Sequence, residues 1–257
     1  MNRIQTADLV LWQFPRWQQE PGLVHFVSDR HAGGPGSEFT LSLSSTPDQE
    51  VVRSNRARVA AALGLPADQL FFPSQVHETK VVRVTSATTA HDLLHTDALI
   101  TNEPGIGIAV MSADCVPILL YDRHHRAVGA VHAGWRGTVA HLLAKTLTAM
   151  QLAFGTEGKH VLAAIGPSAS QANYEVGSEV VQAVDAAFGE HHQLLIRHAN
   201  GKAQLDLWKA NVWQLEQFGV PAAHIAVANL CSIGNHQYFF SARKGDSGRY
   251  AAGVALV

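Results

Sequence analysis

Hydrophobic positions along the chain gather into short, nearly unbroken runs separated by turn residues, a pattern typical of buried β-strands. Two of these runs, 116–121 and 127–132, flank the polar segment 122–126 and predict a hairpin that is buried on both faces. The same pattern predicts further strands at residues 23–28, 70–76, 80–84, 97–101, 106–111, 160–165, 225–230, 238–241 and 253–257.

Four segments between these runs are predicted to be helices. The first begins with Thr46 as its N-cap and Pro47 in the first helical position, and it ends at residue 63 before Gly64. The others span residues 134–154, 177–188 and 207–218. No internal repeat, low-complexity tract or linker interrupts this order, so we expect a single domain over residues 1–257.

Composition narrows the function classes. The chain has 257 residues, 47% hydrophobic and 16% charged, which is enough for a large core. The net charge of −2 gives no electrostatic footprint for nucleic acid or an anionic membrane, and the apolar run 116–121 is too short for a membrane span. Two cysteines form no disulfide framework, and the first residues show no secretory signal, so we expect a cytoplasmic location.

Three potential metal ligands follow apolar runs, at points where a strand gives way to a turn or helix. They are His77, Cys115 and His132. Two imidazoles and one thiolate suit a catalytic zinc site, because three protein ligands leave the fourth position open for water or substrate. The spacing between the three matches no short zinc motif, so the argument depends on ligand chemistry alone.

The same three residues fit two other kinds of chemistry. His₂Cys is also an electron-transfer copper arrangement, so copper is a second candidate metal. Without a metal, Cys115 would be the nucleophile of a hydrolase and His132 or His77 its base. The alternative to zinc, copper and hydrolase chemistry is a purely structural role, because a lone buried cysteine more often packs as a small hydrophobic residue.

Polar residues near the three ligands are candidates for substrate binding. Gln75 precedes His77 at strand spacing, so both side chains are expected on one face. Arg136 lies in the turn after His132, where a helix N-terminus would help to hold phosphate. Arg243 and Arg249 belong to a glycine-flanked basic loop; such loops are usually solvated, and closure over an anionic substrate is the alternative.

Other cysteine and histidine positions are less informative. Cys231 follows an apolar residue and is expected in the core. His124 and His125 fall in the turn of the predicted hairpin and are expected to be solvated, and His191 and His192 would cap the end of a helix.

A series of short motifs, taken together, gives the chain a family likeness. In chain order they are Gln75-Val-His77, Asp97-Ala-Leu-Ile-Thr101, Ser112-Ala-Asp-Cys115-Val-Pro117, His132-Ala-Gly-Trp-Arg-Gly137, Ile165-Gly-Pro167, Tyr174-Glu-Val-Gly177, Leu205-Asp-Leu207 and Phe239-Phe-Ser241. The chain resembles the YfiH family, whose members are also labelled polyphenol oxidases or laccase-domain proteins and are described as purine nucleoside phosphorylases. The resemblance extends from about Asn55-Arg56 to the C-terminal loop.

The resemblance implies a mixed α/β (α+β) fold in which mixed sheets pack between helices. It implies a single zinc held by His77, Cys115 and His132, which would also be the catalytic residues. It implies phosphorolysis of adenosine, inosine and methylthioadenosine, and deamination of adenosine, so the partners would be a purine nucleoside and phosphate. The residues expected to bind them are Gln75, Arg56, Arg136 and Arg243. The alternatives are a copper-dependent polyphenol oxidase and a Cys-His amide hydrolase that edits peptidoglycan precursors.

Overall fold

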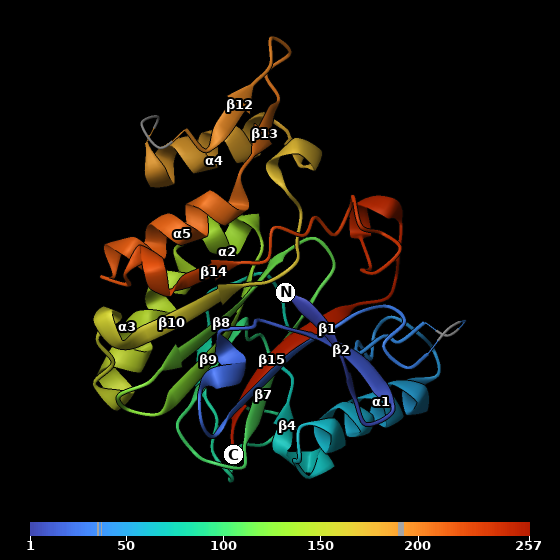
Figure 1. Ribbon diagram of the computed structural model, residues 1–257. Coiled ribbons are helices and arrows are strands. Elements are labelled where there is room, and N and C mark those ends of the chain that lie inside the picture. Colours follow the sequence, from blue (N-terminus) through green and yellow to red (C-terminus); the bar gives the residue numbers. More distant parts are fainter. Residues whose placement is uncertain (35, 37, 190–192) are drawn as a thin grey trace.

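The computed structural model describes residues 1–34, 36, 38–189 and 193–257, and within them it has a mixed α+β architecture (Figure 1). The first of two six-stranded sheets is antiparallel except where its last two strands pair. Its strands, in spatial order, are β1 (Asn2–Thr6), β2 (Leu9–Gln13), β3 (Leu23–Ser28), β15 (Tyr250–Leu256), β7 (Gly107–Ser112) and β4 (Leu70–Phe71).

The second sheet contains the predicted hairpin at its centre. Its spatial order is β14 (Ile225–Val227), β10 (Val161–Ile165), β8 (Val116–Asp122), β9 (Ala127–Ala133), β6 (Ala98–Thr101) and β5 (Val81–Arg83). A third, antiparallel sheet of three strands has the order β11 (Glu175–Val176), β13 (Ala203–Leu205) and β12 (Leu195–Arg197).

The five helices in the described residues are α1 (Gln49–Ala62), α2 (Trp135–Val139), α3 (Leu142–Phe154), α4 (Ser178–Phe188) and α5 (Leu207–Gln217). Four of them cover the outer faces of the two large sheets, and α4 packs against α2 beside the small third sheet (Figure 1). Short 3₁₀ turns lie at Trp17–Gln19, Ala67–Gln69, Gly158–His160, Gln171–Asn173, Ala222–His224 and Ala242–Lys244. No helix in the described part of the chain has both the length and the apolar character that a membrane crossing needs.

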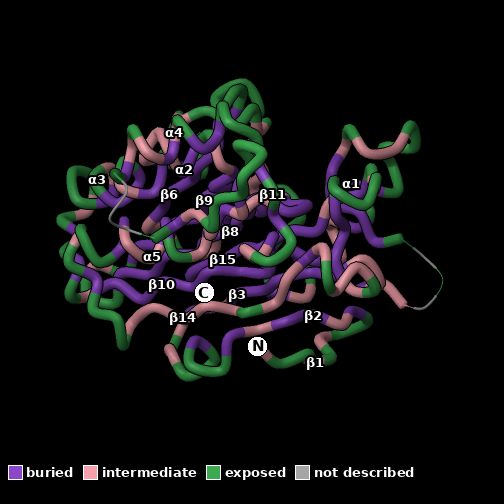
Figure 2. Tube along the Cα trace, turned by 90° about the horizontal axis from the view of Figure 1, so that it is seen from above, coloured by how far each residue is buried: buried purple, intermediate pink, exposed green. Residues whose placement is uncertain are grey.

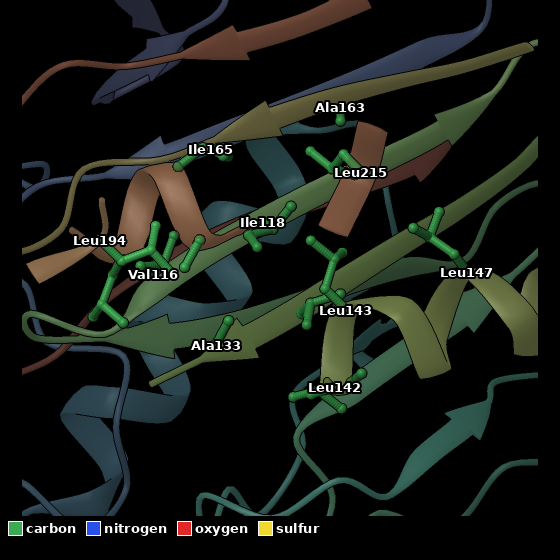
Figure 3. Close-up of a cluster of buried hydrophobic side chains, with 14 of the residues drawn as sticks. Val116, Ile118, Ala133, Leu142, Leu143, Leu147, Ala163, Ile165, Leu194 and Leu215 are labelled. Atoms are coloured by element: carbon green, nitrogen blue, oxygen red, sulfur yellow. The ribbon is translucent and has the colours of Figure 1, made fainter. Parts of the chain in front are cut away.

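The alternation of side chains along β8 shows how the layers stack. Ile118 and Leu120 face α3 and α5 in one apolar cluster, whereas Leu119 and Tyr121 face the first sheet in another. A third cluster lies between the first sheet and α1. The sheets are therefore packed between helices, as expected, and burial is concentrated in the strands (Figure 2). Figure 3 shows the cluster under α3 and α5, to which Ile118 and Leu143 both belong.

Several predicted elements are confirmed, and others need correction. The 23–28 strand and the hairpin form as predicted. The strand predicted at 70–76 ends at Phe71, since Pro73 lacks an N–H and Ser74 bonds to Leu93 instead. Residues 238–241 form a turn rather than a strand, because their first two N–H groups donate to Asn235.

Two helix boundaries also differ from the prediction. The N-cap of α1 is Asp48, not Thr46, because the Asp48 carboxylate accepts from the N–H groups of residues 50 and 51. The helix predicted at 134–154 is broken into α2 and α3 at His141, whose φ of 57° is left-handed. His191 and His192 lie outside the described residues. The strands of the N-terminal hairpin and of the small third sheet were not predicted.

Candidate metal centre

His77 lies in a loop between the two large sheets rather than at the end of a strand. Its φ of 65° is in the left-handed region, so the expected strand spacing between Gln75 and His77 does not apply. Gln75 is instead held against β7, where its amide accepts from the N–H of Met111 at 2.8 Å and donates to that residue's carbonyl at 2.9 Å. Both side chains nevertheless line the same cavity.

Cys115 lies in the tight turn that joins β7 to β8. Asp114, with a φ of 85°, makes the turn. The carboxylate of Asp114 points away from the thiol, because Oδ1 accepts from Ser232 Oγ at 2.6 Å and Oδ2 accepts from Ser241 Oγ at 2.9 Å. The turn therefore directs Cys115 toward the imidazoles while Asp114 anchors the C-terminal loop.

His132 is the penultimate residue of the buried strand β9, and its ring completes the cluster. Candidate ligand atoms of His77, Cys115 and His132 all lie within 4.8 Å of one another. The two imidazole rings meet edge to face with their centroids 4.8 Å apart. Two nitrogens and one sulfur at this spacing fit a zinc ion with an open fourth position.

The electrostatics of the cluster favour a thiolate. Burial alone would raise the pKa of Cys115, but the charges and hydrogen bonds of His132 and His77 outweigh it and lower the pKa of the thiol. Burial alone would lower the pKa of His132, but the Cys115 thiolate and the Asp97 carboxylate raise it. The deprotonated sulfur that a metal needs is therefore already stabilised.

A cavity of about 840 Å³ opens over the three ligands. Three of the four predicted substrate residues, Gln75, Arg56 and Arg243, line it. Arg136 is absent from the described residues that line the cavity, since it is exposed and stacks on Trp135 with its guanidinium carbon 4.2 Å from the ring centroid. Arg136 is the second residue of α2, which has five residues.

Arg56 presents a cation to the cavity. Within the described residues its guanidinium forms no ion pair, but donates to the carbonyl of Leu41 at 2.9 Å and lies 4.1 Å from the ring centroid of Phe72. Burial, followed by the charge of Arg53, lowers the pKa of Arg56 to about 10, so it stays protonated at neutral pH. An unpaired, half-buried guanidinium of this kind is suited to bind an anion.

Residues beyond the three ligands and the four predicted substrate residues also shape the site. Arg249, Phe72 and Tyr174 line the cavity, and Arg243 lies over Tyr174 with its guanidinium carbon 4.8 Å from the ring centroid. Asp97 forms a hydrogen bond with Nδ1 of His132 at 2.8 Å. Its place in the motif Asp97-Ala-Leu-Ile-Thr101 is the signal for this residue in the sequence.

Comparisons with known proteins agree with this geometry. Residues 24–257 match the model of the family described as multi-copper polyphenol oxidoreductase laccase. The crystal structure of the hypothetical protein YfiH from Bacillus licheniformis superposes with a TM-score of 0.89 at 26% identity, covering 99% of this chain and 98% of that one. The chain belongs to the YfiH family.

Two relatives of the chain carry the names of enzymes that act on purine nucleosides. A purine nucleoside phosphorylase of Bacteroides thetaiotaomicron is 39% identical over 98% of both chains. Adenosine deaminase RL5, from an unknown prokaryotic organism, is 40% identical over 77% of this chain and 79% of its own length. The structure of YlmD from Geobacillus stearothermophilus has a TM-score of 0.86 at 29% identity, with 99% and 98% coverage.

Proposed function

We propose that the protein is a zinc-dependent purine nucleoside phosphorylase that acts on adenosine, inosine and methylthioadenosine, with adenosine deamination as a second activity. The names of its relatives support both reactions. The observation that carries phosphorolysis is the placement of Arg56 in the same cavity as the His77–Cys115–His132 cluster. A volume of about 840 Å³ is within the usual range for small-molecule sites and leaves room for a nucleoside with phosphate.

The charge of the cavity lining favours an anionic co-substrate. Arg56, Arg243 and Arg249 line it, whereas Asp114 is the single carboxylate among the described lining residues. Both oxygens of Asp114 are engaged, with Oδ2 also accepting from the N–H of Arg243 at 2.9 Å. The cavity therefore offers cations to phosphate and little competing negative charge.

In the proposed reaction a phosphate oxygen bonds to the anomeric carbon of the ribose as the bond from that carbon to the base breaks. The electron pair stays with the base, and the base gains the proton that hydrogen phosphate loses. Arg56 would bind and orient the phosphate, and the Gln75 amide, fixed by Met111, would help to position the nucleoside. His77, Cys115 and His132 would hold the zinc ion, which would supply Lewis acidity in the cavity.

Deamination is the second candidate because of the curated name of one relative. Zinc deaminases pair the metal with a carboxylic acid that transfers protons. Glu78 follows His77 but is absent from the described lining residues, and Asp114 is engaged. We therefore expect deamination to be slower than phosphorolysis.

The oxidase and the hydrolase remain the competing hypotheses. A multi-copper oxidase needs several metal positions, and the described residues contain one group of converging ligands. A hydrolase would use the Cys115 thiolate as nucleophile without a metal, which the thiolate-stabilising electrostatics also permit.

A product assay tests the proposal. Protein with confirmed zinc content is incubated with adenosine, with and without phosphate, and the products are separated by chromatography and mass. Adenine and ribose 1-phosphate formed in a phosphate-dependent manner are the expected major products, with inosine as a minor one. If zinc-loaded protein forms neither ribose 1-phosphate nor inosine, the proposal is overturned in favour of the hydrolase or the oxidase.

A further inference from the structure

One buried carboxylate connects two of the three candidate ligands. Asp97 lies just before β6 and has no exposed surface. Its Oδ1 is 2.8 Å from Nδ1 of His132 and accepts from the N–H of His77 at 3.0 Å. Its Oδ2 accepts from the N–H groups of Val76 and Glu78 at 3.2 and 2.9 Å.

These backbone bonds hold His77 in a conformation that it would not adopt alone. A left-handed φ is unfavourable for a residue with a β-carbon, and His77 has a φ of 65°. Its side chain is exposed, so burial contributes little to holding it. Three successive N–H groups that converge on one carboxylate offset the cost and fix the direction of the imidazole.

The bond to His132 fixes which ring nitrogen faces the cluster. The two oxygens of Asp97 already accept from three backbone N–H groups, so the carboxylate also faces His132 as an acceptor. Nδ1 of His132 must therefore carry the proton, which leaves Nε2 for a metal. A backbone hydrogen bond also joins the two residues, because the N–H of His132 donates to the carbonyl of Asp97 at 2.8 Å.

We propose that Asp97 is the positioning residue of the metal centre. It presets the loop of His77 and presents Nε2 of His132 to the ion, without being a ligand itself, because both of its oxygens are occupied. The inference rests on the proposed metal centre and adds a residue that acts through the ligands rather than on the substrate.

A second aspartate in the chain provides a matched control. Asp122 is equally buried, and its carboxylate accepts from the N–H groups of His124 and His125 at 2.9 and 3.2 Å. It also lies 2.8 Å from Nδ1 of His125. Both carboxylates therefore accept from backbone N–H groups and face Nδ1 of a histidine, but Asp122 lies at the other end of β8 from Cys115.

The experiment measures zinc affinity by competition with a chelator for the native protein, Asp97→Asn and Asp122→Asn. The asparagine amide would turn N–H groups toward the donors of Asp97, so we expect about 10–100-fold weaker zinc binding. Asp122→Asn should change the affinity by less than about threefold. Equal affinities of the two variants would overturn the role of Asp97 and leave the metal centre intact. A native protein that binds no zinc would overturn both.

A measurement on the native protein covers the case in which Asp97→Asn does not fold. Nitrogen-15 NMR of the zinc-loaded protein reports which imidazole nitrogen carries the proton. The proposed role of Asp97 predicts that Nδ1 of His132 is protonated and that Nε2 binds zinc. Zinc on Nδ1 would contradict the positioning role directly.

Discussion

Gly134 leaves the space that the sulfur of Cys115 occupies. A β-carbon on Gly134 would lie 2.8 Å from that sulfur and 3.3 Å from Cδ2 of His77. The backbone of Gly134, with φ −68° and ψ 175°, is open to any residue, so the glycine is required by the neighbouring ligands and not by the chain itself.

Gly134→Ala should therefore damage the metal centre without unfolding the protein. The methyl group would displace the Cys115 sulfur, and we expect zinc affinity to fall on the order of 10-fold. Gly177→Ala is the control, because Gly177 precedes α4 with φ −81° and ψ 174° and nothing lies within 4 Å of its β-carbon position. Equal zinc affinity in both variants would show that the close contact does not matter.

Arg56→Gln should weaken phosphate binding. Hydrogen bonds to charged groups contribute about 1.5–3 kcal/mol, so the KM for phosphate should rise roughly 10–100-fold, with the zinc content unchanged. Steady-state kinetics with varied phosphate at saturating nucleoside measure the effect.

The control for Arg56 lies on the same helix. Arg53 is exposed and pairs with Glu50 at 3.5 Å, away from the cavity lining among the described residues. Arg53→Gln should leave the KM for phosphate unchanged. If both variants behave like the native enzyme, Arg56 does not bind phosphate.

Removing the metal separates the proposed enzyme from a cysteine hydrolase. Chelation should abolish turnover of purine nucleosides, and added zinc should restore it, because the three ligands hold the ion in the cavity. Cys115→Ala should lose both zinc and activity, whereas Cys231→Ala, which removes a free thiol outside the cluster, should keep both. Full activity after chelation, with alkylation of Cys115 as the only inhibitor, would favour the hydrolase.

His25 makes the stability of the fold depend on pH. Its buried ring accepts from the N–H of Phe14 at 2.8 Å, and burial lowers the pKa of His25 from 6.5 to about 4. Between pH 6.5 and about 4 the unfolded chain therefore binds a proton that the folded protein does not. The free energy of unfolding falls over this range as the pH is lowered, by on the order of 3 kcal/mol from this group.

A matched pair of variants isolates that contribution. His25→Gln keeps an acceptor and removes the titration, so urea unfolding at pH 7 and 4.5 should show a smaller loss of stability than in the native protein. His198→Gln, at an exposed position, should lose as much as the native protein. Zinc release at low pH affects all three proteins alike. An unchanged loss in His25→Gln would show that His25 is not the group responsible.

The elements that the sequence predicts well are those whose signal is local. The hairpin of β8 and β9 combines two apolar runs with a polar turn, and the structure pairs Val116 with Ala133 through to Asp122 with Ala127. The break at His141 depends on distant residues, because its ring packs against Phe188 and Trp213, with centroids 5.3 and 6.5 Å away. Propensity alone does not reveal such a break.

The site divides in the same way. His77, Cys115 and His132 are identified by ligand chemistry and by family motifs, which are visible in the sequence. Asp97 is 20 residues from His77 and 35 from His132, so its role appears only when the chain is folded. Arg136 was selected because a helix was expected to begin beside it, but the structure places the side chain on Trp135, outside the described cavity lining.

The central claim is tested most directly with inosine, which lacks the amine that a deaminase removes. Zinc-loaded protein is mixed with inosine and phosphate, and phosphorus-31 NMR follows the fate of the phosphate, with Cys115→Ala as the control. We predict that inorganic phosphate is converted to ribose 1-phosphate by the native protein and not by the variant. Unchanged phosphate, with zinc confirmed at the site, would contradict the assignment as a phosphorylase.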